Sequence, residues 1–269
     1  MTELFAGLVD DAGRFPPAAL PMAAALARHR QDRQRGHPVL SGRFLCAAQD
    51  IADLLAGVFP SDELQLSLIC PPDLDAIGHA VRAVGGQAPM KLVAVEHPAL
   101  DASWGPRLPA GVRRFVEVGP NGPDAAVLEQ LRGEDGAVKI RCGGLRTELF
   151  PSTRTLARTL LSCVDGGVPI EATAGLHRPV RHRDEATGFV HHGFLNILLA
   201  VGRRLTGGDE DDAAAVLDST DEPLLVAEAR AADAAAIRRV FHSYGSCDTA
   251  EPIVELERLR LIPQAAGTA

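Results

Sequence analysis

The feature that most constrains the fold is an alternation of short apolar runs with longer helical stretches. Seven short runs rich in β-branched residues occur before residue 175, and stretches of helical periodicity separate most of them. This alternation is typical of a parallel sheet with crossover helices. The predicted strands are Gly7–Asp11, Val39–Cys46, Leu64–Cys70, Met90–Glu96, Arg113–Val118, Ala137–Cys142 and Pro169–Ala174. The predicted helices between them are Ala18–Arg33, Asp50–Val58, Asp73–Val84, Asp124–Arg132 and Ser152–Val164.

Seven such units favour an eight-stranded (β/α)8 barrel of the TIM type over an open sheet. A Gly-x-Gly-x-x-Gly motif after the first strand would favour a dinucleotide-binding sheet, and the sequence has none there. The segment Phe189–Gly193, which leads into an expected helix Phe194–Leu205, is the candidate for the eighth strand. Ser152 supplies a capping hydroxyl for the helix that begins after it.

The chain is expected to form one domain over residues 1–269. Residues 1–206 are the expected barrel core, and residues 207–263 are an expected C-terminal extension that begins with an acidic loop and continues as helices. Residues 264–269 are an expected frayed tail. The loop Gly245–Cys247 near the end of this helical extension is left without an assigned role.

Charge and hydropathy exclude several classes of protein. A net charge of −8 disfavours nucleic-acid binding, which needs a basic surface. The apolar runs are far shorter than the roughly 20 residues that cross a bilayer, and no secretory signal is visible. Five scattered cysteines without a Cys-x-x-Cys pair indicate reduced thiols. The expectation is therefore a cytoplasmic protein with no nucleic-acid or membrane partner, and the sequence leaves open whether it forms a homo-oligomer.

Lys139 stands out because the chain has 27 basic residues, of which only Lys91 and Lys139 are lysines. An arginine bias of this kind is common in bacteria with GC-rich genomes. Side chains alternate across a strand, so the apolar set Val138, Ile140 and Cys142 should face the helices. Lys139 and Arg141 should then point into the barrel.

Parity places further charges on the same inner surface. Glu96, Glu117 and Glu171 are expected to point inward from the neighbouring strands, and Arg43 from an earlier one. One interpretation is a buried network of ion pairs that only fixes the packing. The interpretation preferred here is an active site, because barrel interiors are usually filled with branched apolar side chains. Glu117 and Glu171 are then candidate proton-transfer groups, since carboxylates serve as general acids and bases.

A barrel-interior lysine near Arg141 is expected to have a lowered pKa and to act as a nucleophile or a base. The run Val138–Gly144, with a lysine on the sixth strand closely followed by glycine, resembles the Schiff-base class I aldolases of the deoxyribose-phosphate aldolase type. The likeness covers about seven residues and the strand count. It implies that Lys139 forms an imine with the substrate and that Glu117 or Glu171 moves protons.

Arg141 and Arg43 are the candidate clamps for a substrate carboxylate or phosphate. A salt bridge to a neighbouring glutamate is the alternative for Arg141. Gly143 and Gly144 follow at the carboxyl end of the strand, where barrel active sites lie, and their backbone N–H groups can approach an anion. A tight turn is the alternative for these two glycines.

Four of the nine histidines fall between residues 177 and 192. His177 follows the seventh strand and is a candidate general acid or base at the mouth of the barrel. His192 and Asn196 are candidate substrate-binding residues at the same mouth. A divalent metal held by His177, His192 and a carboxylate is an alternative, although the spacing matches no specific metal motif.

The sequence therefore predicts an enzyme, a lyase or an isomerase, that uses Lys139 on a small anionic substrate and needs no cofactor. Two alternatives stay open. One is a metal-dependent barrel hydrolase or aldolase that uses His177 and His192, and the other is a barrel that binds a ligand without catalysis.

Overall fold

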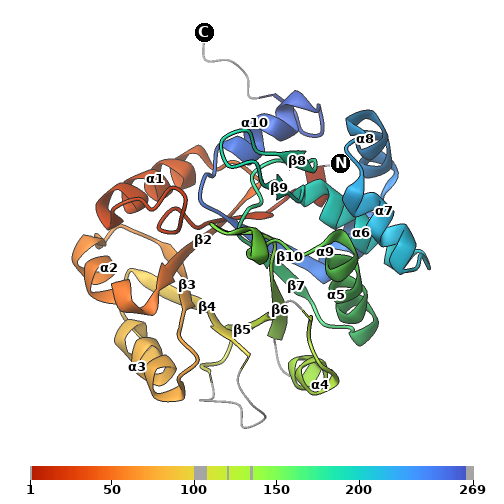
Figure 1. The fold of residues 1–269 in the computed structure, drawn as a ribbon. Coiled ribbons are helices and arrows are strands. Elements are labelled where there is room, and N and C mark those ends of the chain that lie inside the picture. The colour runs from red at the N-terminus through yellow and green to blue at the C-terminus, as the bar shows by residue number, and fades with distance from the viewer. Residues whose placement is uncertain (1, 100–107, 120, 134–135, 265–269) are drawn as a thin grey trace.

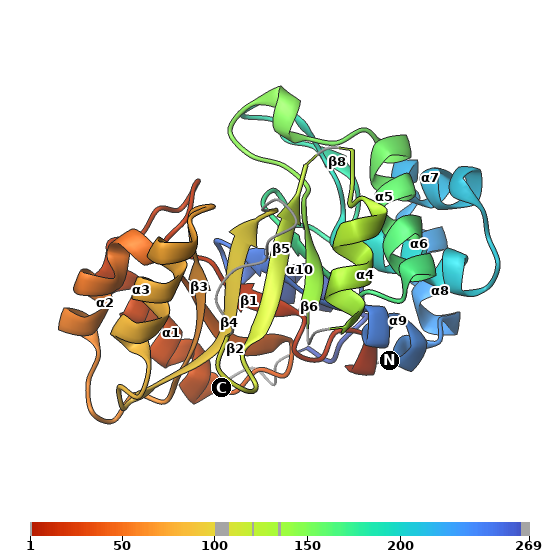
Figure 2. The ribbon, with the colours of Figure 1, turned by 90° about the horizontal axis from the view of Figure 1, so that it is seen from below.

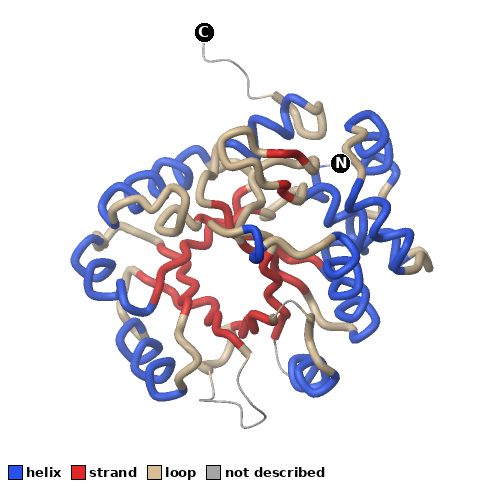
Figure 3. The backbone as a smooth tube through the Cα atoms, viewed as in Figure 1, coloured by secondary structure: helices blue, strands red, loops and turns tan. Residues whose placement is uncertain are grey.

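Eight parallel strands close into a barrel, and helices surround it in the computed structural model (Figures 1 and 3). The structure describes residues 2–99, 108–119, 121–133 and 136–264. In order around the barrel, the strands are β1, β10, β7, β6, β5, β4, β3 and β2. Their bounds are β1 Val9–Asp11, β2 Leu40–Ala47, β3 Leu64–Ile69, β4 Met90–Pro98, β5 Arg113–Val118, β6 Gly136–Arg141, β7 Ile170–Thr173 and β10 Phe241–Ser246.

Helices cover the outside of the barrel, and two shorter strands pair outside it. The helices are α1 Met22–Arg35, α2 Ile51–Gly57, α3 Leu74–Val84, α4 Ala125–Gly133, α5 Thr153–Gly166, α6 Phe194–Leu205, α7 Glu210–Asp218, α8 Glu222–Ala231, α9 Ala234–Val240 and α10 Glu251–Arg258. Single 3-10 turns span η1 Thr2–Leu4, η2 Ala48–Asp50 and η3 Thr147–Leu149. The antiparallel pair consists of β8 His182–Arg183 and β9 Val190–His191. Figure 2 shows the segment after β6 projecting together with β8 on one side of the barrel.

The predicted barrel and its first seven strands are confirmed, but the predicted eighth strand is wrong. Phe189–Gly193 contributes to the small β8–β9 pair, and the barrel closes through β10, which pairs with β7 and with β1. The barrel core therefore does not end at residue 206. Phe241–Ser246 escapes sequence analysis because its inward positions, such as Ser243 and Gly245, are small or polar and resemble a loop.

The acidic segment after residue 206 also differs from the expected loop. Asp209 Oδ1 accepts a hydrogen bond from the backbone N–H of Asp212, and Asp212 Oδ2 accepts one from the backbone N–H of Asp209. This reciprocal cap begins α7, so residues 210–212 form its first turn. The predicted cap of α5 is confirmed, since Ser152 Oγ accepts from the N–H of Thr155 at 3.1 Å. Residues 265–269 of the expected tail lie outside the described residues.

The hydrophobic core lies between the strands and the helices, as the parity of the strands predicts. Val138, Ile140 and Cys142 of β6 are buried with the inner faces of α5 and α6. Inside the barrel, Ala94, Phe115 and Ala137 form a small apolar cluster. A register shift in β4, where Leu66 pairs with Leu92 but Ser67 pairs with Ala94, brings Ala94 and Glu96 to the inner face. Among the described residues, no helix is both long and apolar enough to cross a membrane.

Candidate functional site

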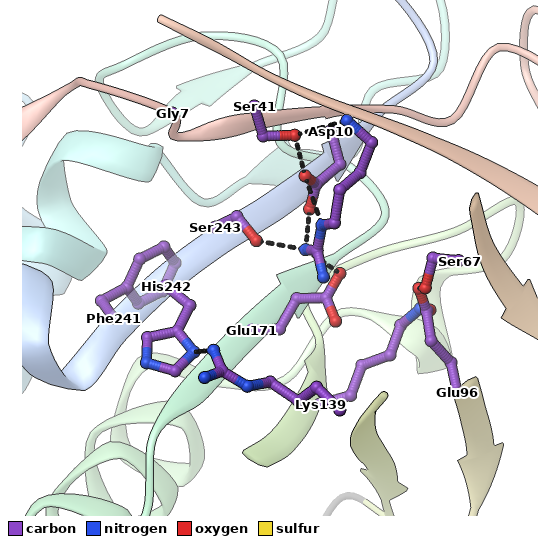
Figure 4. A network of polar contacts seen from close by, with 12 residues as sticks. Gly7, Asp10, Ser41, Ser67, Glu96, Lys139, Glu171, Phe241, His242 and Ser243 are labelled. Atoms are coloured by element: carbon purple, nitrogen blue, oxygen red, sulfur yellow. Dashed lines mark hydrogen bonds and ion pairs between the residues drawn. The ribbon is translucent and has the colours of Figure 1, made fainter. Parts of the chain in front are cut away.

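The inner surface of the barrel carries two joined groups of buried charges. In the first, the Lys139 ammonium donates to Glu96 Oε2, and Ser67 Oγ donates to Glu96 Oε1 at 2.5 Å. Lys139 is on β6, whereas Glu96 and Ser67 are on β4 and β3, so the contact passes through the interior (Figure 4). The side chains of Lys139 and Glu96 are only 2% and 1% exposed. The predicted inward direction of Lys139 is confirmed.

The second group centres on Arg43. Its guanidinium binds both carboxylate oxygens of Asp10, and its Nη2 lies 2.5 Å from Ser243 Oγ and 3.4 Å from Glu171 Oε1. Ser41 Oγ also donates to Asp10. In Figure 4, Glu171 lies between the Asp10 side and the Lys139 side of the interior. Asp10, Ser243 and Glu171 thus bind Nε and Nη2 of Arg43, which gives Arg43 a holding role, and its expected role as a clamp on a substrate stays a prediction.

A bulge between β1 and β2 explains how Arg43 reaches this position. Val9 pairs with Leu40, but Asp11 pairs with Phe44, so the two strands are out of step around Asp10. Gly42 accommodates the extra length of β2 with φ of +79°, a conformation that favours glycine. Below the network, Arg43 lies over the ring of Phe115 at 4.9 Å, within range of a cation–π contact.

The expectation that Lys139 has a lowered pKa is wrong. Burial does lower the pKa of Lys139, but the negative charges of Glu96, Glu171 and Glu117 outweigh burial and raise it above the usual value. Arg141, expected to repel the ammonium charge, instead pairs with Glu117. Lys139 is therefore an ammonium ion at neutral pH.

The pKa of Glu171 is raised in this network. Burial raises it well above the usual value, and the charge of Glu96 adds to the effect, while Arg43 and Lys139 only partly oppose it. Glu171 Oε2 is buried, and no partner of it is found among the described residues. Three carboxyl groups (Asp10, Glu96 and Glu171) face two cations, so a proton on Glu171 leaves the interior electrically neutral. Glu171 therefore holds a proton more readily than a carboxyl group in water does.

Arg141 and Glu117 form a more open ion pair at the carboxyl ends of β6 and β5. Arg141 Nε lies 2.9 Å from Glu117 Oε1, and the two side chains are 39% and 25% exposed. The salt-bridge alternative for Arg141 is confirmed, and anion binding stays a prediction, because a guanidinium paired with one carboxylate at the rim keeps donors for a second anion.

Close packing explains why positions 143 and 144 are occupied by glycine. A Cβ atom at Gly143 would lie 2.8 Å from Phe150 and 3.1 Å from the Cα of Gly175, and one at Gly144 would lie 2.5 Å from Leu149. The segment around η3 therefore covers both glycines. Absence of a Cβ lets the chain at these positions pack closely against Phe150, Leu149 and Gly175, and the expected role of the two glycines in binding an anion stays a prediction.

His177 lies at the mouth, where the sequence places it. Its Nε2 is 3.9 Å from the Sγ of Cys247, and its Nδ1 is 3.8 Å from Glu251 Oε2. Burial lowers the pKa of His177, and the charge of Glu251 opposes this only in part. His177 is therefore neutral at pH 7 and can accept a proton.

His192 and Asn196 do not face the mouth. His192 is 1% exposed, its Nε2 lies 2.7 Å from the carbonyl of Pro151, and burial lowers its pKa to about 4. Asn196 is fully buried and bonds the backbone of Arg181, Val216 and Ser219. Both side chains fasten segments together, so the expectation that they bind substrate is not supported.

The histidines also do not gather as the metal-dependent alternative requires. His182 stacks on His191 with ring centroids 5.3 Å apart, while His177 contacts Cys247 and His192 contacts Pro151. Within the described part of the chain, no three histidine, cysteine or acidic side chains are placed to share a metal ion.

Sequence reasoning gave too little weight to Asp10, left Cys247 in a loop without an assigned role, and missed Ser243. Asp10 is fully buried at the end of β1 and holds Arg43, whereas the sequence only indicates an acid at a strand end. Ser243 and Cys247 belong to β10 and its carboxyl end, so the misplaced eighth strand concealed both. The alternation of Phe241, Ser243 and Gly245 with larger residues was the available signal.

The fold and its interior together define a TIM-type (β/α)8 barrel with a buried ionic network that ends in an open ion pair at the carboxyl rim. Comparisons with protein-family models, with curated proteins and with solved structures found no match to this chain.

Proposed function

We propose that the protein is an enzyme, a lyase or an isomerase, that moves a proton on a small anionic substrate. The observation that carries the proposal is the buried charge cluster of Lys139, Glu96, Glu171, Arg43 and Asp10 beneath the carboxyl rim. Burying such charges is costly, and apolar side chains of similar volume would hold a barrel core at least as well. A proton-transfer site would explain why the barrel interior holds charged side chains in place of apolar ones.

Arg141 is the residue that we assign to substrate binding. It lies at the rim and is more than a third exposed, so a carboxylate or phosphate can compete with Glu117 for its donors. Glu117 is the residue of β5 paired in register with Lys139, so a substrate bound in its place on Arg141 lies close to Lys139. A substrate bound this way brings its carbonyl or hydroxyl group toward the buried network.

Lys139 and Glu171 are the residues that we assign to proton transfer. The Lys139 ammonium stabilises negative charge that develops on a substrate oxygen, or donates a proton to it. Glu171 has a raised pKa, and its Oε2 has no hydrogen-bond partner in the part of the chain that the structure describes, so it gives up a proton and can take one back from carbon. Glu96 and Arg43 hold these two groups in place.

The raised pKa of Lys139 makes the ammonium role preferable to the imine that the aldolase resemblance implies. An imine needs the neutral amine, and Glu96 favours the charged form. Borohydride treatment in the presence of small keto acids and sugar phosphates separates the two mechanisms. Reductive trapping of a substrate on Lys139 at neutral pH would establish the imine instead.

Deuterium exchange tests the proposal directly. Small hydroxy acids, keto acids and sugar phosphates are incubated with the protein in heavy water, and NMR detects exchange at carbon. We expect Lys139→Met and Glu171→Gln to abolish exchange. We expect Arg141→Met to raise KM more than it lowers kcat, and Arg146→Met, an exposed arginine in the loop after β6, to change neither.

The ligand-binding alternative makes the opposite prediction. If the barrel is only a frame, a folded variant with Glu117, Lys139 and Arg141 all replaced by apolar residues should bind the same compounds as the parent protein. Retained binding together with an absence of exchange for every compound would overturn the proposed reaction.

A further inference from the structure

Closure of the barrel through β10 brings a thiol, an imidazole and a carboxylate together at the carboxyl rim. Cys247 directly follows β10, His177 follows β7, the neighbouring strand, and Glu251 begins α10. The contacts run in series, with 3.9 Å between Cys247 Sγ and His177 Nε2 and 3.8 Å between His177 Nδ1 and Glu251 Oε2. The three residues are separate from the Lys139 network and have no part in the reaction proposed above.

The surroundings of Cys247 differ from those of the other cysteines. Cys247 is 7% exposed, against 0–3% for Cys46, Cys70, Cys142 and Cys163. Its sulfur also lies near the backbone N–H groups of Ala18 and of Cys247 itself, which favour the thiolate. Burial, the larger effect, still raises the pKa of the thiol, so the resting pair is a neutral thiol beside a neutral imidazole.

We infer that Cys247 is a nucleophile, that His177 is its general base, and that the site accepts an acyl group from an ester or a thioester. A nucleophile, a histidine and a carboxylate in this order perform acyl transfer on several unrelated folds. Contacts of this kind are often long before a substrate is bound and shorten in the complex. The side chain of His177 is 18% exposed, so the imidazole is in contact with solvent at the rim.

The chemical step balances without a cofactor. As Cys247 Sγ forms a bond to the carbonyl carbon, its proton passes to His177 Nε2, and the carbonyl π electrons move to oxygen. The carbon–leaving-group bond then breaks, and His177 returns the proton to the departing alcohol or thiol. The products are an acyl-Cys247 thioester and the free alcohol or thiol, and Glu251 stabilises the transient imidazolium.

Selective alkylation tests the activation of the thiol. Iodoacetamide is added to the folded protein, and peptide mass spectrometry follows each cysteine over a range of pH. We expect Cys247 to react first and His177→Gln to slow it at least about tenfold at pH 7. The two rates should converge at high pH, where the thiolate forms without a base. A purely structural role for His177 would not produce this convergence.

Charged groups on every neighbouring segment also shape this pH profile. The groups that act on the pair are Arg28 of α1, Asp184 after β8, His191 of β9, Asp248 in the turn before α10, and Glu251. His182→Gln is the matched control, because His182 stacks on His191 and bonds the Val180 carbonyl without contacting the thiol. We expect this control to react like the parent protein.

Acyl capture tests the substrate class. With p-nitrophenyl acetate as the probe, we expect one acetyl group on Cys247 and none in Cys247→Ala. Cys70→Ala is the control, because it removes a buried thiol whose pKa is raised to about 11. We expect Cys247 to be acetylated in this control. We also expect Cys247 to be acetylated in Lys139→Met. A failure of the proton-transfer proposal can therefore be distinguished from a failure of this inference. If Cys247 reacts no faster than the buried cysteines, or if His177→Gln leaves the rate unchanged at every pH, the inference is overturned.

Discussion

At the scale of single residues, the protonation of the groups inside this barrel depends on which charged side chains lie next to one another. Lys139 differs from an ordinary buried lysine because Glu96 binds it directly and Glu171 and Glu117 lie nearby. Burial and the charge of Glu96 make it hard for Glu171 to ionise. The protonation of Glu171 therefore depends on its neighbours and cannot be assigned from its residue type alone.

The pH dependence of stability should reveal the proton on Glu171. The pKa of Glu171 is raised in the folded state, so its contribution to stability is complete below about pH 4.5 and is lost as pH rises toward the folded-state pKa. Glu171→Gln imitates the protonated acid. We expect the free energy of unfolding of this variant, measured in urea, to fall less than that of the parent protein as pH rises.

Asp62→Asn is the control for that experiment. Asp62 is a carboxylate whose pKa is lowered by its hydrogen bond to Arg30, so its replacement should remove stability mainly above its usual pKa. Parallel pH curves for the parent protein and Glu171→Gln would show that Glu171 is not protonated in the folded protein.

At the scale of secondary-structure elements, local signals predicted the helices better than the last strand. The cap at Ser152 and the apolar face of α5 both follow from nearby residues. The strand β10 has a weaker local signal, because its inward positions are the small residues Ser243, which bonds Arg43, and Gly245, which lies beside Leu45. Its pairing with β7 and β1 decides its conformation.

Ser152→Ala should show how much the predicted cap contributes. The hydroxyl bonds the N–H of Thr155 in the first turn of α5, so its loss should lower the free energy of unfolding by about 1 kcal/mol. Ser162→Ala is the matched control, since Ser162 lies inside the same helix and bonds only the carbonyl of Arg158. Equal effects of the two substitutions in urea unfolding would contradict a capping role.

At the scale of the whole molecule, the barrel depends on a strand near the carboxyl end of the chain. β10 pairs with β1, so residues more than 200 positions apart complete the closed sheet. This closure also brings Ser243 into the buried network and Cys247 to the rim beside His177. The candidate sites therefore exist only when both ends of the chain are in place.

A fragment of residues 1–206 should not fold on its own. Without β10, the edges of β1 and β7 are unpaired, and Arg43 loses Ser243. We expect no cooperative unfolding transition by circular dichroism. Production of the fragment together with residues 207–269 should restore the transition, because the break falls in the exposed turn between α6 and α7. A cooperative transition for residues 1–206 alone would contradict this dependence.

The sequence by itself determined the barrel class, seven of its strands and the inward direction of Lys139, because these follow from the local periodicity of apolar residues. Only the tertiary structure decided which strand closes the barrel, which carboxylate binds Lys139 and the direction in which its pKa shifts. These properties depend on contacts between strands that are distant in the chain, and on the balance of burial against surrounding charge. The same reason explains why Asp10, Ser243 and Cys247 acquired their importance only in the folded protein.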